Sequence, residues 1–179
     1  MKETGAKQVD LIAHSMGNLP MIEALTLMQN DLRASGIPVS PASTNISQII
    51  FAAPDVPRTT FEEQIADIAK LGRGVTLYAS GKDLALQAAN KLSRGLVRAG
   101  EVPEPPLGPL IMGKVLDTID VTATSTDFFS LNHSGFAERS PLINDIALIL
   151  KTGQHPPDQR SPVLRTIQAQ AGTYWQYPK

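Results

Sequence analysis

Cysteine is absent from the 179-residue chain, which excludes disulfide bonds, thiol nucleophiles and cysteine-ligated metals but leaves the redox compartment open. An excess of one charge is also missing, since 16 Lys and Arg against 17 Asp and Glu give a formal net charge of −1. Nothing here indicates a nucleic acid or an anionic membrane surface as a partner. No apolar run approaches the ~20 residues of a membrane-spanning helix, and residues 1–8 (MKETGAKQ) lack a signal-peptide core. We expect a soluble protein without an integral membrane segment, cytoplasmic or, if an upstream signal is lost, secreted or periplasmic.

What the chain does have is an alternation of apolar runs and helical patterns. With 42% apolar and 18% charged residues, it can bury the core of one domain. Strands are predicted at residues 8–14, 46–53, 75–80 and 117–122, helices at 17–30, 60–71 (Thr60 as N-cap), 83–94 and 141–150, and loops at 31–45 and 99–110. The strands are apolar throughout, which is typical of an α/β fold with a parallel sheet and helices on both faces. Catalytic groups in such a sheet lie beyond the carboxyl ends of the strands.

The stretch VDLIAHSMGN at residues 9–18 places a serine between an apolar strand and an amphipathic helix. Residues 13–17 match the nucleophile elbow G-x-S-x-G, except that Ala13 replaces the first glycine. In such a turn the Ser15 hydroxyl is exposed, and the backbone N–H of Met16 is one donor to an oxyanion. The alternative is that Ser15 only caps the helix, but the strand before it and the helix after it favour a catalytic nucleophile.

A serine nucleophile needs a base, and the chain has three histidines. His14 is next to the serine, and its side chain should point elsewhere, so we interpret it as structural. His155 lies in the segment GQHPP, where we expect it to be exposed. His133 follows the fourth predicted strand and precedes a helix, which is where this fold places its base. The sequence therefore predicts His133 as the general base.

Two aspartates are good candidates for the acid that orients this histidine. Asp83 follows the third predicted strand (YASGKD), and Asp55 follows the second (FAAPD). Both placements occur in hydrolases of this fold, and the later one is commoner, so Asp83 is favoured and Asp55 is the alternative. Their purely structural roles would be a helix N-cap for Asp83 and a cap of the turn at Pro54 for Asp55. Weaker candidates flank the fourth strand: Asp117, Asp120 and Asp127.

Five segments carry a family resemblance: DLIAHSMGN, FAAPDVPRTTFEEQ, VTLYASGKDLAL, TIDVTATSTDFFSLNHSGF and SPLINDIALIL. Together, over about residues 8–152, they resemble a family of largely uncharacterised bacterial α/β hydrolases that are esterase- or lipase-like. The resemblance implies a partial α/β-hydrolase domain at residues 1–152, with Ser15 as the nucleophile, Asp83 as the acid and His133 as the base.

The resemblance also implies what the chain lacks. Family members have a long segment before the elbow strand, which supplies the first four strands and a loop with the second oxyanion N–H. The chain therefore resembles the C-terminal half of a hydrolase, in which we expect impaired activity. The uncovered edge of the elbow strand is an aggregation hazard, so we expect a second copy, giving a homo-oligomer, or the N-terminal peptide to cover it. Residues 153–179 are expected to form a Pro- and Gln-rich tail that packs Tyr174, Trp175 and Tyr177 onto the domain.

These observations favour a serine hydrolase that acts on a small-molecule carboxylic ester and needs no metal or organic cofactor. Two alternatives stay open. One is a catalytically silent fragment or interaction module with a hydrolase fold, because a fold alone does not determine function. The other is acyl transfer to an acceptor other than water, which uses the same triad. The substrate is not identified, and three phenylalanines belong either to a pocket or to the core: Phe128, Phe129 and Phe136.

Overall fold

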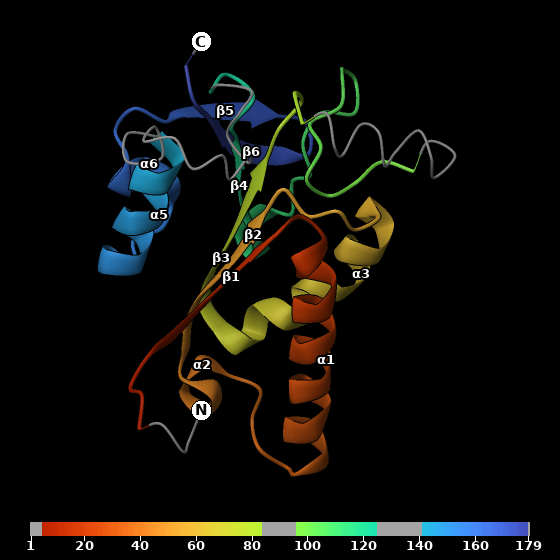
Figure 1. Ribbon diagram of the computed structural model, residues 1–179, viewed down its shortest axis with the longest axis vertical. Coiled ribbons are helices and arrows are strands. Elements are labelled where there is room, and N and C mark those ends of the chain that lie inside the picture. The colour runs from red at the N-terminus through yellow and green to blue at the C-terminus, as the bar shows by residue number, and fades with distance from the viewer. Residues whose placement is uncertain (1–4, 84–95, 125–140, 179) are drawn as a thin grey trace.

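The computed structural model describes residues 5–83, 96–124 and 141–178 (Figure 1). The helix predicted at 83–94 lies outside the described residues except for Asp83. In chain order the elements are β1 (Val9–His14), η2 (Ser15–Gly17), α1 (Asn18–Ala34), α2 (Pro41–Thr44), β2 (Ile46–Ala52), α3 (Arg58–Ile68), η3 (Ala69–Leu71), β3 (Gly72–Ala79), η4 (Gly113–Val115), β4 (Asp117–Asp120), α5 (Pro141–Thr152), α6 (Pro157–Arg160), β5 (Arg165–Ala169) and β6 (Gly172–Gln176), where η marks a short 3-10 helix.

Six strands form one sheet in the order β1-β2-β3-β4-β6-β5. The strand pairs from β1-β2 to β4-β6 are parallel, and β5 runs antiparallel beside β6. Parallel neighbours need a crossover connection between them, and α1 and α3 supply two of these on one face of the sheet, while α5 covers the other face (Figure 1). The predicted α/β fold, with a largely parallel sheet and helices on both faces, is confirmed.

The core lies on both sides of the central strands. Every residue of β2 is buried, because β2 has a strand on each edge and helices over each face. Alternate side chains of a strand point to opposite faces, so Ile49 and Phe51 pack toward α1 and α3, whereas Ile50 packs toward α5. Phe51 also meets Phe61 of α3 edge to face, with the ring centroids 5.0 Å apart.

β1 departs from the prediction of a fully apolar, buried strand. It lies at the edge of the sheet, and none of its six residues is fully buried. Ile12 is 48% exposed, although its register partner Ile50 is fully buried. The physical reason is that, within the described ranges, no strand pairs with the outer edge of β1. The uncovered edge that the sequence predicts beside the elbow strand is thus present in the described part of the chain.

Helix boundaries also differ from those predicted. α3 begins at Arg58 with Pro57 as its N-cap, so Thr60 lies inside the helix and the N-cap prediction is wrong. The Arg58 N–H donates to the Val97 carbonyl at 2.9 Å, a distant backbone partner that takes the place of a side-chain cap. The predicted loop at 31–45 contains the end of α1 and the short helix α2.

The C-terminal residues form more than a packed tail. After α6, β5 and β6 make an antiparallel hairpin. β6 pairs with β4 through Ile119–Trp175 and Asp120–Gln176, so the hairpin continues the sheet. Trp175 and Tyr177 are buried and join the apolar cluster beneath α5.

Candidate functional site

The serine of the elbow motif lies on a sharp turn at the carboxyl end of β1. β1 ends at His14, the turn η2 follows, and α1 begins at Asn18. Ser15 has a φ of 52°, a left-handed conformation that costs a non-glycine residue on the order of 1–3 kcal/mol. A strained strand-to-helix turn of this kind is what a nucleophile elbow requires. The N-cap positions are His14 and Gly17, without side-chain capping bonds, so the alternative of Ser15 as a helix cap is not supported.

Asn18 holds this turn in place, and the sequence reasoning missed it. The residue is fully buried, and its Nδ2 donates to the Ser15 carbonyl at 2.7 Å and to the Ala52 carbonyl at 3.2 Å. The backbone N–H of Asp55 also donates to the Ser15 carbonyl, at 3.3 Å. The strained residue is therefore tied to the end of β2. The only signal in the sequence was an asparagine directly after Gly17, before an apolar helical pattern, which a search for catalytic side chains overlooks.

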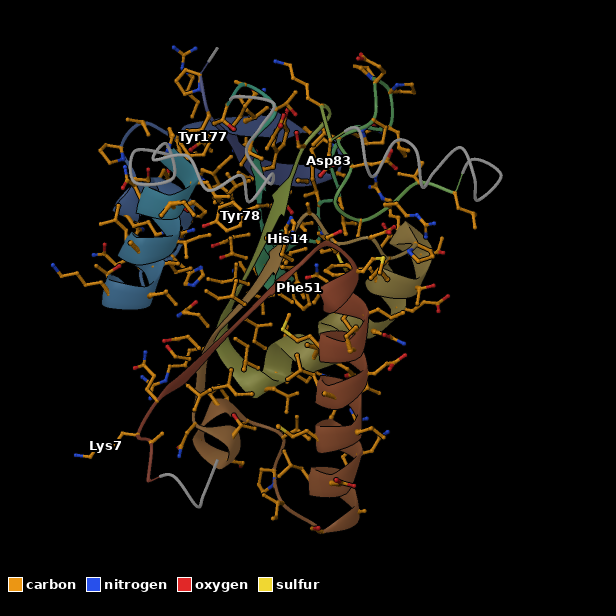
Figure 2. The ribbon with its side chains drawn as sticks, in the orientation of Figure 1. Lys7, His14, Phe51, Tyr78, Asp83 and Tyr177 are labelled. Atoms are coloured by element: carbon orange, nitrogen blue, oxygen red, sulfur yellow. The ribbon has the colours of Figure 1, made fainter. Side chains whose placement is uncertain are left out.

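Asp83 lies at the same end of the sheet as the elbow, in the loop after β3 (Figure 2). Its carboxylate acts electrostatically on the imidazole of His14. Desolvation by burial is the largest effect and lowers the pKa of His14 below its usual 6.5, while the negative charge of Asp83 raises it in part. The favoured acid thus lies within electrostatic reach of the residue next to the serine. The turn at Ser15 and the loop with Asp83 lie at the same end of the sheet, because β1 and β3 run parallel and both have their carboxyl ends there.

The predicted base lies in a part of the chain that the structure does not describe. His133 belongs to residues 125–140, so its role as base stays a prediction. The same range contains another predicted candidate and the three phenylalanines: Asp127, Phe128, Phe129 and Phe136. The described chain brings four of the predicted site residues together at the carboxyl end of the sheet, namely the predicted nucleophile, the predicted oxyanion donor and both predicted acids: Ser15, Met16, Asp55 and Asp83.

Asp55 follows β2 as predicted, but its carboxylate has a partner far along the chain. Arg98 Nε lies 3.2 Å from Asp55 Oδ1, and the two side chains are 12% and 20% exposed. The two atoms interact as a buried ion pair without the alignment of a hydrogen bond. Capping of the turn at Pro54, the structural role considered from sequence, is therefore not what holds this side chain.

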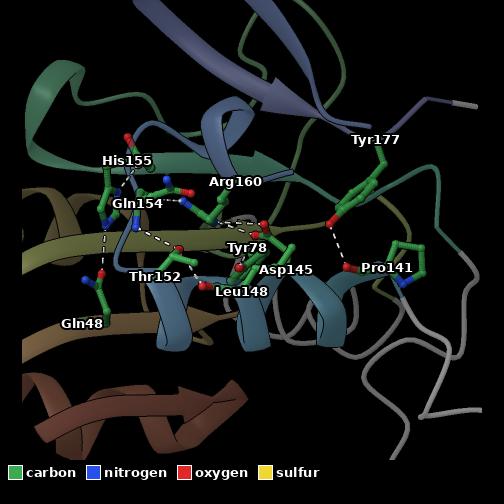
Figure 3. Close-up of polar contacts among 11 residues, drawn as sticks. Gln48, Tyr78, Pro141, Asp145, Leu148, Thr152, Gln154, His155, Arg160 and Tyr177 are labelled. Carbon is green, nitrogen blue, oxygen red and sulfur yellow. Dashed lines mark hydrogen bonds and ion pairs between the residues drawn. The ribbon is translucent and has the colours of Figure 1, made fainter. Parts of the chain in front are cut away.

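His155, which we expected to be exposed, is 24% exposed and engaged on both ring nitrogens (Figure 3). Its Nδ1 lies 2.5 Å from Asp117 Oδ2, and its Nε2 lies 2.9 Å from Gln48 Oε1. The ring fits there because residue 74 is glycine, where a Cβ would lie 2.0 Å from Nε2. This cluster is near the amino ends of the strands, opposite the elbow, so His155 and Asp117 are not part of the site around Ser15.

Asp120 is likewise held by structural contacts. Its carboxylate accepts from the Thr122 backbone N–H at 2.8 Å and from the Gln176 side chain at 3.2 Å. In the described ranges no three His, Asp or Glu side chains gather in a way that could hold a metal ion. Of the helices that the structure describes, none combines the length and the apolar character needed to cross a membrane.

Comparison with known proteins gives the family. A family model described as alpha/beta hydrolase of unknown function (DUF900) matches residues 1–151. The chain belongs to this family. The resemblance to an α/β-hydrolase family of unknown function is therefore confirmed. Neither the curated proteins nor the solved structures contain a match to this α/β hydrolase.

Proposed function

We propose that this α/β hydrolase is a serine hydrolase that cleaves carboxylic esters, with Ser15, Asp83 and His133 as its triad. The observation that carries the proposal is the positive φ of Ser15 on a strand-to-helix turn at the carboxyl end of a parallel sheet. A strained backbone of this kind persists only where its surroundings hold it, and such sites are often functional. Hydrogen bonds from Asn18 and Asp55 to the Ser15 carbonyl supply that support.

In the proposed reaction, Ser15 Oγ attacks the acyl carbon and its proton passes to His133. The backbone N–H of Met16 stabilises the oxyanion of the tetrahedral intermediate, and Asp83 stabilises the imidazolium. The bond to the alcohol oxygen then breaks as His133 returns the proton to that oxygen, which leaves an acyl-enzyme. Water repeats these steps on the acyl group, releases the acid and restores the serine. Neither a metal nor an organic cofactor takes part.

In this proposal the elbow provides one oxyanion donor, the Met16 N–H, and its contribution should be large, because loss of one such donor typically costs on the order of 100- to 1000-fold in turnover. A catalytically silent interaction module is the second candidate, and the uncovered outer edge of β1 in the described chain favours it. Acyl transfer differs from hydrolysis only in the final acceptor, so product analysis in the presence of an added alcohol separates these two reactions.

The test is covalent labelling with a fluorophosphonate, alongside hydrolysis of short-chain p-nitrophenyl esters. Ser15→Ala removes the nucleophile, and Ser35→Ala, at an exposed serine after α1, is the matched control. We expect the parent and Ser35→Ala to be labelled equally and Ser15→Ala not at all, with Asp83→Asn and His133→Ala greatly slowed. Equal labelling of Ser15→Ala would refute Ser15 as the nucleophile. A parent chain that neither labels nor hydrolyses esters would favour the silent module.

A further inference from the structure

Residues 97–102, here called the bridging segment, contact both loops of the candidate site. On one side Ala99 N–H donates to the Val56 carbonyl at 2.9 Å, and Gly100 N–H donates to the Pro54 carbonyl at 3.1 Å. On the other side Ser80 N–H donates to the Gly100 carbonyl at 2.9 Å. The bridging segment therefore links the turn after β2 to the loop after β3, which carries Asp83.

The fit of this segment allows little variation. A Cβ at Gly100 would lie 2.5 Å from the Ala53 carbonyl carbon and 2.6 Å from the Pro54 nitrogen. A Cβ at Gly81 would lie 2.9 Å from the Val102 carbonyl oxygen. Because all three atoms belong to the backbone, they cannot move aside as a flexible side chain could. The bridging segment is in direct backbone contact with both loops.

The Asp55–Arg98 ion pair fastens the bridging segment next to the nucleophile. The side chain of Asp55 holds Arg98, and its backbone N–H donates to the Ser15 carbonyl at 3.3 Å. Arg98 is fixed from a second direction, because its backbone N–H donates to Glu101 Oε2 at 2.8 Å. Asp55 therefore connects the strained turn at Ser15 to the segment that reaches the Asp83 loop.

We propose that Asp55 and Arg98 are positioning residues, whose ion pair keeps the Ser15 turn and the Asp83 loop at a fixed separation through the bridging segment. This proposal rests on the proposed triad of Ser15, Asp83 and His133, and it assigns the alternative acid a different role. Asp55 acts through its contacts with Ser15 and Arg98 and does not orient the base. A displacement of about 1 Å in a catalytic group can cost on the order of 100-fold in rate, so loosening this link should be visible in the chemistry.

The first readout does not require activity. Amide hydrogen exchange is followed residue by residue in the parent, in Arg98→Met and in Asp55→Asn. Arg33→Met is the matched control, because Arg33 pairs with Asp67 at the same 3.2 Å but at an exposed position. We expect faster exchange in both variants at the Asp55 amide and at Ser80, on the two sides of the bridging segment, and no change in Arg33→Met. Faster exchange confined to residues 97–102 would overturn the proposal.

The second readout is the rate of fluorophosphonate labelling at Ser15 and its pH profile, measured where each variant is fully folded. We expect Arg98→Met and Asp55→Asn each to slow labelling by ~10- to 100-fold, with the double variant no slower than either one. Arg98→Lys should recover part of the rate, and the pH profile should keep the shape of the parent. Asp83→Asn, by contrast, should lose ~10⁴-fold, as expected of a triad acid.

The outcomes separate the two proposals. If Asp55→Asn loses as much rate as Asp83→Asn is expected to lose and also changes the pH profile, Asp55 is the acid and the positioning role is wrong. Labelling of Arg98→Met at the rate of the parent would also overturn the positioning role. If the parent is not labelled at Ser15, the proposed hydrolase activity fails, and the hydrogen-exchange comparison still decides whether Asp55 and Arg98 couple the two loops.

Discussion

The two flanks of the sheet are built in opposite ways. On the β1 flank, Ile12 is 48% exposed, and Leu27 on the outer face of α1 is 64% exposed. On the C-terminal flank, the hairpin β5–β6 extends the sheet from β4, and a fully buried ion pair joins α5 to α6. A shallow depression along one side of α1, next to side chains that pack against the core, is lined mainly by apolar side chains: Ala24, Leu27, Met28, Asp31, Leu32 and Ser35. Both flanks end in an edge strand of the described sheet, β1 or β5, but the β1 flank exposes large apolar side chains, whereas the C-terminal flank holds a buried polar network between β3, α5 and α6.

The polar contacts of the C-terminal flank converge on one carboxylate (Figure 3). Tyr78 Oη donates to Asp145 Oδ2 at 2.6 Å, and Arg160 donates through Nε and Nη2 to the two carboxylate oxygens at 3.0 and 3.1 Å. Arg160 Nη1 donates to the Gln154 carbonyl at 2.9 Å. Removing one partner of such a pair strands a buried charge, so this flank should tolerate few rearrangements. The C-terminal flank is therefore fixed by its own internal contacts, whereas the β1 flank is suited to association with another chain.

The largest effect that we expect comes from breaking the buried pair. Arg160→Met leaves the Asp145 carboxylate buried without its cation, which should lower the free energy of unfolding by about 3–5 kcal/mol. On the β1 flank, the same substitution in the exposed Arg33–Asp67 pair should change stability little. Urea denaturation of both variants measures the difference, and equal shifts of their midpoints would remove the contrast between the flanks.

A smaller loss should follow from filling the space beneath the His155 ring. In Gly74→Ala the new Cβ would lie 2.0 Å from Nε2, so the ring must leave Asp117 and Gln48, at a cost of about 1–3 kcal/mol. In a His155→Ala background the same substitution should cost much less, because the remaining close atom, Gln48 Oε1 at 2.8 Å, is the end of a flexible side chain. Thermal melts of the four proteins in this cycle test the prediction, and additive losses would show that His155 is not the obstacle.

Alkaline pH should weaken the C-terminal flank selectively. Burial, together with the charge of Asp145 and the hydrogen bond to it, raises the pKa of Tyr78 well above 10.0. The stability that this shift represents is complete below pH 10 and is lost as the pH rises toward the folded-state pKa, because the unfolded chain releases the proton first. The slope is about 1.4 kcal/mol per pH unit for one tyrosine.

Denaturation midpoints between pH 8 and 11 should therefore fall more steeply for the parent than for Tyr78→Phe. Tyr174→Phe is the matched control, because the pKa of Tyr174 is also raised but its side chain is more accessible. Removing the Tyr174 hydroxyl should therefore reduce the pH dependence of the midpoint less than removing that of Tyr78. Identical slopes for the parent and Tyr78→Phe would contradict the role of burial. All three tyrosines of the chain lie on β3 or at the C-terminal hairpin, so the β1 flank should not contribute.

The smallest effect on stability is expected on the β1 flank, where association should change instead. The expectation that a second copy covers the β1 edge stays a prediction. Ile12→Lys places a charge on that edge, a device that discourages strand pairing, and should reduce self-association without shifting the unfolding midpoint. Leu107→Lys, at another exposed apolar position, is the control. Sedimentation over a range of concentrations measures this, and a parent that stays monomeric throughout would show the expectation to be wrong.

Much of the fold could be predicted from local patterns. The four parallel strands β1 to β4 and the helices α1, α3 and α5 lie where apolar periodicity places them, because burial on one or both faces leaves a regular trace in the sequence. The sharp strand-to-helix turn at Ser15 could also be predicted, since it is encoded by a short contiguous motif. The hairpin β5–β6 was missed as strands because β5 is mostly exposed and β6 is mostly half-buried, so neither strand carries a clear alternation of buried and exposed residues.

What the sequence did not reveal are pairs of residues distant along the chain. His155 was expected to be exposed because its neighbours are Pro, Gly and Gln, yet its partners Gln48 and Asp117 come from other elements. In the same way nothing near Asp55 points to Arg98. Apolar character also cannot say whether a strand is central or at an edge, which is why β1 was predicted to be buried.

The bridging segment has a consequence for how the sequence of this end of the molecule can change. Arg98 and Glu101 form isolated β-bridges with Pro57 and Ser80, and a Cβ at Gly100 would lie against the backbone of Ala53 and Pro54. A side chain at residue 100 would therefore displace the turn after β2, and through it the loop after β3. We expect substitutions in these three segments to be coupled, so that a change accepted in one of them requires a compensating change in another.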